Sequence, residues 1–312
     1  MKQTIAVIIS LIILFFITTF FLLPSKSNIT LSVKVNAPVA CLQRVLSNKN
    51  YSAKWLPKET KQLNSNKFLL DGCSFTFISD YFQNNSITVK HKNINSTSII
   101  YFTSNRDSSL ANLNFIFASN KNPFTKISDY FTYKHVEQTT QKILNSLQLF
   151  LSKNENVYGV EMKKAILTDS TLIAIKSTSL SYPTLLEIYK NIEILKTYTY
   201  SSGAVNTNPP MLNIYKDGEN GYAFMVALPI NKRLKNSGNI ISKSMLAGGN
   251  ILQSGEIKGG FYTVENFLKE LENFKADVNG ISPAIPYQSL ITDRSKESDT
   301  SKWITKLYYP IF

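Results

Sequence analysis

The chain is 312 residues long and 43% hydrophobic, which is ordinary for a globular protein and excludes gross disorder. Its net charge of +13 is unevenly spread, because residues 1–150 hold 16 Lys and Arg but only 6 Asp and Glu. An anionic lipid surface would attract such a half. No nucleic-acid partner is expected, because the sequence has no recognition-helix pattern and no Arg-rich stripe.

From Thr4 to Leu23 the chain has no charged residue, Gly or Pro. About 20 such residues cross a hydrocarbon core of about 30 Å. A cleaved signal peptide would have a shorter apolar centre and a small-residue cleavage site. We therefore predict that residues 1–26 form a single uncleaved transmembrane anchor that contacts membrane lipid. The lysines on its two sides nearly balance, so the side of the membrane stays open.

Residues 27–152 are predicted to form the first folded unit. Ile29–Val35 alternates apolar and polar residues, as a half-buried strand does, and Pro38 suits the first turn of a short helix. Strand-like stretches follow at 67–80, 86–93, 97–104 and 111–119. A final helix has an inward stripe at three- and four-residue spacing, made of Val136, Thr140, Ile143, Leu147 and Phe150.

The segment SVKVNAP at 32–38, followed by VLSNKNYSAKWLP at 45–57, resembles the start of the SRPBCC (START-like) superfamily. This resemblance implies a helix-grip fold over about 125 residues, in which a curved sheet wraps the last helix around an apolar cavity. Members of that superfamily bind lipids, polyketides and hormones, and some are cyclases. The resemblance identifies no catalytic residue.

Residues 157–312 contain an internal duplication. Leu228-Pro229-Ile230 recurs 81 positions later as Tyr309-Pro310-Ile311, and Tyr182 and Tyr262 stand 80 apart. Each copy is predicted as strand, helix, strand, strand. Such a duplication forms one antiparallel sheet with both helices on one face and leaves the opposite face concave, so the predicted fold class is α+β.

Four stretches of this second unit resemble a GyrI-like bacterial effector-binding domain: PPMLNIY (209–215), MVALPIN (225–231), KGG (258–260) and ITDRSKESDTSKWITKLYYPI (291–311). The resemblance implies a concave face that binds aromatic, often cationic, small molecules, and some relatives hydrolyse electrophilic ligands. The family's usual acidic residue aligns with Gln288, and Leu290 stands where a Tyr is common. Both departures imply a modified site.

The inventory of reactive side chains is small: Cys41, Cys73, His91 and His135 are the only thiols and imidazoles. The cysteines either pair in an oxidising compartment or are two small buried apolar residues. Zinc sites use three or four such ligands at close spacing, and the sequence has no such set, so we predict no metal site. No cofactor and no catalytic residue is predicted either, since a lone histidine is more often hydrogen-bonded than catalytic.

The resulting functional prediction is membrane-tethered binding or sensing of a small apolar, aromatic or amphipathic ligand. An enzyme alternative is a hydrolase or cyclase, which would need a carboxylate poised in a low-dielectric cavity. A third alternative is that the concave face binds a peptide or protein. The ligand and the oligomeric state stay open. The predicted ligand-binding residues, most of them rings that can stack on a flat molecule, are Tyr189, Tyr215, Tyr222, Tyr262, Gln288 and Trp303.

Overall fold

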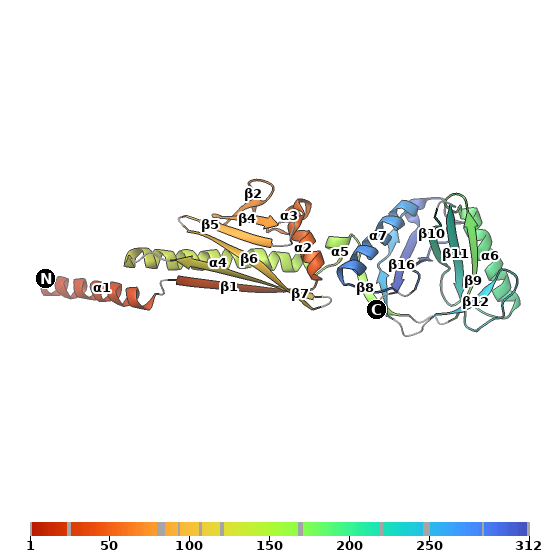
Figure 1. The fold of residues 1–312 in the computed structure, drawn as a ribbon, viewed down its shortest axis with the longest axis horizontal. Coiled ribbons are helices and arrows are strands. Elements are labelled where there is room, and N and C mark those ends of the chain that lie inside the picture. The colour runs from red at the N-terminus through yellow and green to blue at the C-terminus, as the bar shows by residue number, and fades with distance from the viewer. Residues whose placement is uncertain are drawn as a thin grey trace. The chain divides into compact units, whose positions relative to one another are not determined.

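The computed structural model describes residues 2–23, 26–79, 85–92, 94–105, 108–118, 122–167, 171–218, 221–245, 250–282 and 284–310. The chain divides into two compact units, Met1–Lys153 (unit 1) and Asn154–Phe312 (unit 2). Each unit combines a curled antiparallel sheet with helices packed on one face (Figure 1). The predicted α+β class is confirmed.

Unit 1 has a seven-stranded sheet in the order β1-β7-β6-β5-β4-β3-β2. Its helices are α1 (Lys2–Leu22), α2 (Val39–Ser47), α3 (Lys49–Trp55) and α4 (Pro123–Leu151). Its strands are β1 (Lys26–Val35), β2 (Lys61–Gln62), β3 (Lys67–Leu70), β4 (Cys73–Ser79), β5 (Asn85–His91), β6 (Ile94–Asn105) and β7 (Ser108–Ala118).

The long helix α4 packs on the sheet of unit 1. It contacts β1 and β5, and its residues Val136, Ile143 and Leu147 are buried. On β1, alternate residues from Ile29 to Val35 are buried, as the alternation of side chains across a strand requires. The core of unit 1 therefore lies between the apolar face of the sheet and the apolar stripe of α4.

The predicted transmembrane anchor is wrong. A span needs about 20 consecutive, predominantly apolar residues, and no helix in the described part of the chain has that combination of length and apolar character. The helix α1 forms over most of the predicted segment and contacts α4 within unit 1. There, Lys126 Nζ donates a hydrogen bond to the carbonyl of Leu23 at 3.4 Å. The membrane localisation and the lipid partner rested on this anchor and lose their basis with it.

Unit 2 has a nine-stranded sheet in the order β12-β9-β11-β10-β15-β16-β13-β8, with β14 also paired to β16. Its helices are α5 (Glu155–Tyr158), α6 (Leu185–Ser201), α7 (Phe261–Asp277) and the 3-10 helix η1 (Thr300–Lys302). Its strands are β8 (Met162–Ile166), β9 (Thr171–Ser179), β10 (Met211–Lys216), β11 (Tyr222–Pro229), β12 (Ile241–Ser244), β13 (Asn250–Ser254), β14 (Ile257–Lys258), β15 (Tyr287–Leu290) and β16 (Ile304–Pro310).

The strand order of unit 2 is that of a duplication. One copy is β9-α6-β10-β11 and the other is β13-β14-α7-β15-β16, and the two meet where β10 pairs with β15. The edge strands are exchanged between the copies. The strand β8, which precedes the first copy in the sequence, pairs with β13 of the second copy, and β12, which precedes the second copy, pairs with β9 of the first. The two copies thus share one continuous sheet.

Local sequence explains where the two helices of this sheet begin. At α6, the Thr184 side chain accepts from the Glu187 N–H at 3.3 Å, and the Glu187 carboxylate accepts from the Thr184 N–H at 2.7 Å, which is a capping box. Before α7, Gly259 has φ +135°, and a Cβ there would lie 2.7 Å from Thr263 Oγ1. Only glycine therefore fits the bend that leads from β14 into α7.

The two faces of the sheet of unit 2 differ. Side chains of α6, such as Ile192 and Leu195, pack on Leu212 of β10 and Phe224 of β11 in one buried cluster. The opposite face carries a smaller cluster with Met211 and Ala227, against which Tyr287 packs. We call these the helix face and the open face.

We expect unit 2 to fold alone when it begins at Asn154. The sequence predicts that the second unit begins at 157, but Asn154 Nδ2 donates to the carbonyl of Met162 at 3.3 Å, which ties the preceding residues to this unit. Val157 and Tyr158 are buried. Expressed separately, 154–312 should unfold in one cooperative transition, measured by circular dichroism in urea. A molten 154–312 beside a folded full chain would mean that the units share a core.

Candidate functional site

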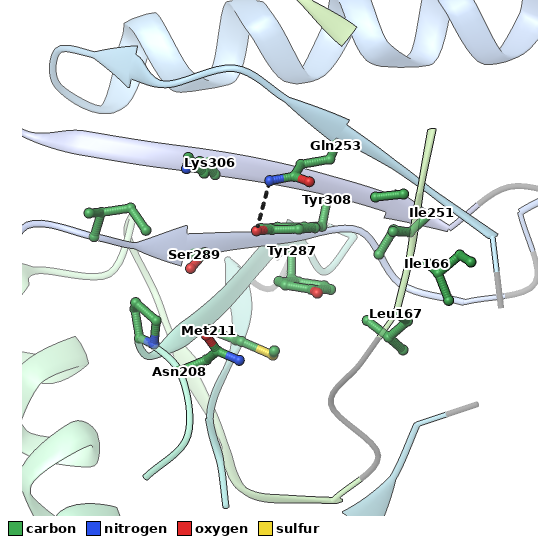
Figure 2. A pocket seen from close by; sticks show the side chains of 13 residues that line it. Ile166, Leu167, Asn208, Met211, Ile251, Gln253, Tyr287, Ser289, Lys306 and Tyr308 are labelled. Carbon is green, nitrogen blue, oxygen red and sulfur yellow. Dashed lines mark hydrogen bonds between the residues drawn. The ribbon is translucent and has the colours of Figure 1, made fainter. Parts of the chain in front are cut away.

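The open face of unit 2 has a cavity of about 260 Å³ (Figure 2). Its walls come from five strands, β8, β10, β13, β15 and β16, and from the segments that follow β8 and precede β10. Side chains held by paired strands are more precisely placed than side chains on loops. The lining residues are Ala165, Ile166, Leu167, Asn208, Pro209, Met211, Ile251, Gln253, Tyr287, Ser289, Ile291, Lys306 and Tyr308.

Two stacked tyrosines form one wall of this cavity. The rings of Tyr287 and Tyr308 have centroids 4.9 Å apart and planes within 9° of parallel, because the two residues are directly paired between β15 and β16. Gln253 Nε2 donates to the Tyr308 hydroxyl at 3.2 Å, which orients the amide along the wall. Figure 2 shows this contact, and it shows Met211 beside Tyr287, which packs against it. This wall of the cavity is therefore aromatic, with polar groups at its edge.

The lining of this cavity carries one described charged residue, Lys306. Lys306 Nζ lies 3.5 Å from a carboxylate oxygen of Glu256, an exposed residue outside the lining, so the two charges are paired. Among the described residues that line the cavity, none is Asp or Glu. A cationic ligand would therefore meet no carboxylate in the lining, whereas an anionic ligand would compete with the exposed Glu256 for Lys306.

Gln288, the residue expected to mark the modified family site, lies on the helix face. It pairs with Leu212 of β10 and Leu307 of β16, and paired residues share a face of the sheet. Its neighbours Tyr287 and Ser289 point to the open face and line the cavity. The sequence contained a signal that Gln288 faces the core. Apolar Leu290 is two residues away on the same strand, so the two side chains lie on the same side of the sheet, and Leu290 is buried.

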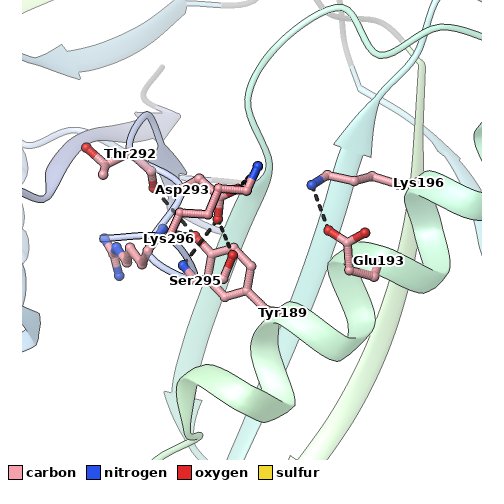
Figure 3. Close-up of polar contacts among 8 residues, drawn as sticks. Tyr189, Glu193, Lys196, Thr292, Asp293, Ser295 and Lys296 are labelled. Atoms are coloured by element: carbon pink, nitrogen blue, oxygen red, sulfur yellow. Dashed lines mark hydrogen bonds and ion pairs between the residues drawn. The ribbon is translucent and has the colours of Figure 1, made fainter. Parts of the chain in front are cut away.

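Two other predicted ligand residues, Tyr189 and Trp303, are brought together by Arg294. The Tyr189 ring points from α6 toward the segment 292–296 (Figure 3), and its hydroxyl accepts from the Arg294 backbone N–H. The Arg294 guanidinium lies 5.0 Å from the centre of the Trp303 ring and donates to Thr305 Oγ1 at 2.6 Å. Tyr189, Arg294 and Trp303 are buried, so these two rings form packing and hydrogen-bonding contacts in the core.

Burial also shifts the pKa values of Arg294 and Tyr189 in this cluster. Desolvation lowers the pKa of the Arg294 guanidinium from its ordinary value, and the nearby Tyr189 and Tyr182 oppose that effect. Burial raises the pKa of Tyr189, and the backbone hydrogen bond from Arg294 lowers it. Arg294 is 7% exposed, and its Nε has no hydrogen-bond partner within the described ranges. A cationic ligand at this position would be repelled by the buried guanidinium of Arg294.

The remaining predicted residues lie apart from the open-face cavity. Tyr222 packs edge-on against Tyr182, with centroids 5.5 Å apart, and Tyr262 at the start of α7 is 79% exposed. Tyr215 is 40% exposed and lines another pocket, of about 510 Å³, between β10, α7 and the segment around Pro286. The structure thus gathers none of the six predicted residues in the cavity of the open face.

Unit 1 has a smaller cavity of about 170 Å³, lined in part by Trp55, Phe68 and Phe77. It lies beside α2, α3, β3 and β4. Elsewhere in unit 1, the side chains of Cys73, His91 and His135 converge, although they are far apart in the sequence. Spacing along the chain gave no sign of this cluster, because the fold alone brings its members together.

No protein-family model and no curated protein sequence matches the chain. Among solved structures, the C-terminal domain of EcmrR is similar, with 18% identity and a TM-score of 0.41, covering 49% of this chain and 98% of that one. EcmrR in complex with DNA matches with 18% identity and a TM-score of 0.43, covering 60% and 69%. SAV2435 bound to tetraphenylphosphonium matches with 14% identity and a TM-score of 0.32, covering 49% and 94%.

These similarities leave the function to be argued from the residues of the present chain. The absence of a nucleic-acid partner stays a prediction.

If Tyr189 has a packing role, Tyr189→Phe will lower stability and leave ligand binding unchanged. The substitution removes the acceptor of the buried Arg294 N–H, a loss that costs about 1–3 kcal/mol. Urea unfolding measures the effect on the free energy of unfolding of unit 2. Tyr215→Phe is the matched control and should change that free energy by less than about 0.5 kcal/mol, because Tyr215 is 40% exposed. Equal effects of the two substitutions would contradict the assignment.

Proposed function

We propose that unit 2 binds a small, flat, neutral or anionic molecule in the cavity of the open face. The observation that carries this proposal is the stacked pair Tyr287 and Tyr308 beside Lys306, in a lining without a described carboxylate. Ligand pockets combine apolar walls with a few placed polar groups, and Gln253, Ser289 and Lys306 supply them here.

The dimensions of the cavity favour a small ligand. Its volume of about 260 Å³ lies near the lower end of the range for small-molecule sites, about 300–1,000 Å³. An aromatic ring stacked on a tyrosine gains on the order of 1 kcal/mol beyond the burial of its surface. A carboxylate on the same ligand would approach Lys306, whose side chain is partly exposed at 28%. One or two fused rings with an acidic or neutral polar group fit these limits.

We extend the proposal to the two families that the sequence resembles. Unit 2 would be a GyrI-like effector-binding domain whose ligand preference has moved away from cations, and unit 1 would be a helix-grip domain of the SRPBCC type. Binding is preferred over hydrolysis or cyclisation in the open-face cavity, because those reactions would need a poised carboxylate there. The peptide-binding alternative fits this cavity less well, since a volume of about 260 Å³ is small for an extended peptide.

The proposal is tested with three probes that share one ring system and differ in charge: naphthalene-2-carboxylate, its neutral carboxamide, and 2-naphthylmethylammonium. We expect the carboxylate and the amide to bind the full chain more tightly than the ammonium. Lys306→Gln should weaken binding of the carboxylate by about fivefold, equivalent to about 1 kcal/mol for a partly exposed charge pair, and leave the amide unchanged. Isothermal titration calorimetry measures all three affinities.

Two identical substitutions on opposite faces locate the site. Gln253→Glu places a carboxylate at the cavity wall and should raise the affinity for the ammonium probe by about fivefold. Gln288→Glu makes the same chemical change on the helix face and should leave all three affinities unchanged. The reverse outcome, an effect of Gln288→Glu alone, would move the binding site to the helix face and overturn the proposal.

A further inference from the structure

Both histidines of the chain lie beside one of its two cysteines in unit 1. Each of Cys73, His91 and His135 brings one ligand atom within 4.8 Å of those of the other two. Cys73 begins β4, His91 ends β5 and His135 belongs to α4. The thiol is buried and the imidazoles are partly exposed, so the cluster has a wall in the core and an opening toward solvent.

A tight turn holds the two strand residues next to each other. Asp71 and Gly72 join β3 to β4 with φ angles of +48° and +73°, and Leu70 pairs with Cys73 across the turn. On the other side, β4 pairs with β5 up to Ser74↔Lys90. Cys73 and His91 are therefore adjacent at the same end of two neighbouring strands.

The carbonyls of the turn orient both imidazoles. Asp71 O lies 2.7 Å from His135 Nε2, and Gly72 O lies 2.9 Å from His91 Nδ1. A carbonyl only accepts hydrogen bonds, so both of these nitrogens carry protons. The lone pairs are then on His135 Nδ1 and His91 Nε2. Histidines that bind metals are held in this way, with the second ring nitrogen donating to a carbonyl or carboxylate.

The same turn is tied to α4 by a second contact. Lys142 Nζ lies 2.6 Å from Asp71 Oδ2, two helical turns along from His135. This ion pair is exposed and contributes little stability by itself. It nevertheless gives Asp71 Oδ2 a partner on α4, while the ligand atoms of the cluster itself are one sulfur and two nitrogens.

We propose that Cys73, His91 and His135 form a zinc site with three protein ligands and a fourth position for water or another small ligand. Zinc bonds of about 2.3 Å to sulfur and 2.0–2.1 Å to nitrogen place tetrahedral ligand atoms about 3.4–3.6 Å apart. The ligand atoms lie within 4.8 Å of one another, so the largest separation would have to close by roughly 1 Å on binding the ion. One thiolate with two imidazoles is a borderline-soft set that suits Zn²⁺ and Co²⁺ and disfavours Mg²⁺ and Ca²⁺.

A cysteine–histidine nucleophile is the alternative use of the same residues. Nucleophilic cysteines present an exposed thiolate to their substrate, whereas the Cys73 thiol is buried behind the two imidazoles. The arrangement therefore favours a ligand over a nucleophile.

The test uses the full chain without a histidine tag. We expect one equivalent of Zn²⁺ per chain by elemental analysis, and competition with a zinc-binding dye gives the affinity. Co²⁺ in place of Zn²⁺ should produce visible ligand-field bands and a near-ultraviolet thiolate-to-cobalt charge-transfer band. Cys73→Ser should abolish the charge-transfer band, and His91→Gln and His135→Gln should each weaken zinc binding more than about 100-fold, beyond the loss typical of an outer-shell partner.

Cys41→Ser is the matched control, because Cys41 is the other buried cysteine of unit 1 and lies outside the cluster. It should retain the cobalt spectrum and the zinc affinity. Circular dichroism confirms that each variant is folded, and the two histidine variants, at partly exposed positions, keep the test decisive if Cys73→Ser does not fold. Any of three results overturns the proposal: no stoichiometric zinc, a cobalt spectrum without the thiolate band, or an affinity that both histidine variants leave unchanged. Binding of Cu⁺ without Zn²⁺ or Co²⁺ would overturn the choice of metal.

Discussion

The pairing of β10 with β15 is the constraint on which the candidate site of unit 2 depends. It joins the two copies of the duplicated unit through Met211↔Ser289 and Leu212↔Gln288. Side chains alternate across a strand, so this register decides which residues of β10 and β15 lie on the helix face and which on the open face. Leu212 and Leu290 belong to the core under α6, while Met211, Tyr287 and Ser289 are directed to the open face, where they line a cavity. A slip of one residue would exchange core and cavity.

The fold class and the duplication of unit 2 could be predicted from the sequence, because both depend on local periodicity. The repeat of Leu228-Pro229-Ile230 as Tyr309-Pro310-Ile311 reports the equivalence of β11 and β16, and the 80-residue spacing of Tyr182 and Tyr262 reports that of α6 and α7. The exchanged edge strands β8 and β12 were not predicted, because short strands at a sheet edge have little periodic signal. The anchor was mispredicted because an uncharged run is only one requirement of a span, and no helix in the described part of the chain combines the necessary length and apolar character.

The candidate sites were harder to predict, for a reason common to both units. Stacking, charge and metal ligation depend on which distant residues the fold brings together. Tyr189 and Trp303 meet at Arg294, a residue that the sequence did not single out. Cys73, His91 and His135 come from two strands and a helix, and the carbonyls that orient the imidazoles belong to an Asp-Gly turn. In each case the sequence shows a residue that can stack or bind a metal, but it does not show which distant residue the fold places beside it.

The central claim is that ligands enter unit 2 from the open face, and methyl NMR of isotopically labelled Met and Ile residues tests it most directly. Saturation with naphthalene-2-carboxamide or naphthalene-2-carboxylate should shift the methyl signals of Met211, Ile166 and Ile251, which line the cavity. The signals of Ile173 and Ile192, which lie in the core between α6 and the sheet, should move much less. Shifts concentrated at Ile173 and Ile192, with Met211 unchanged, would place the ligand on the helix face and contradict the account.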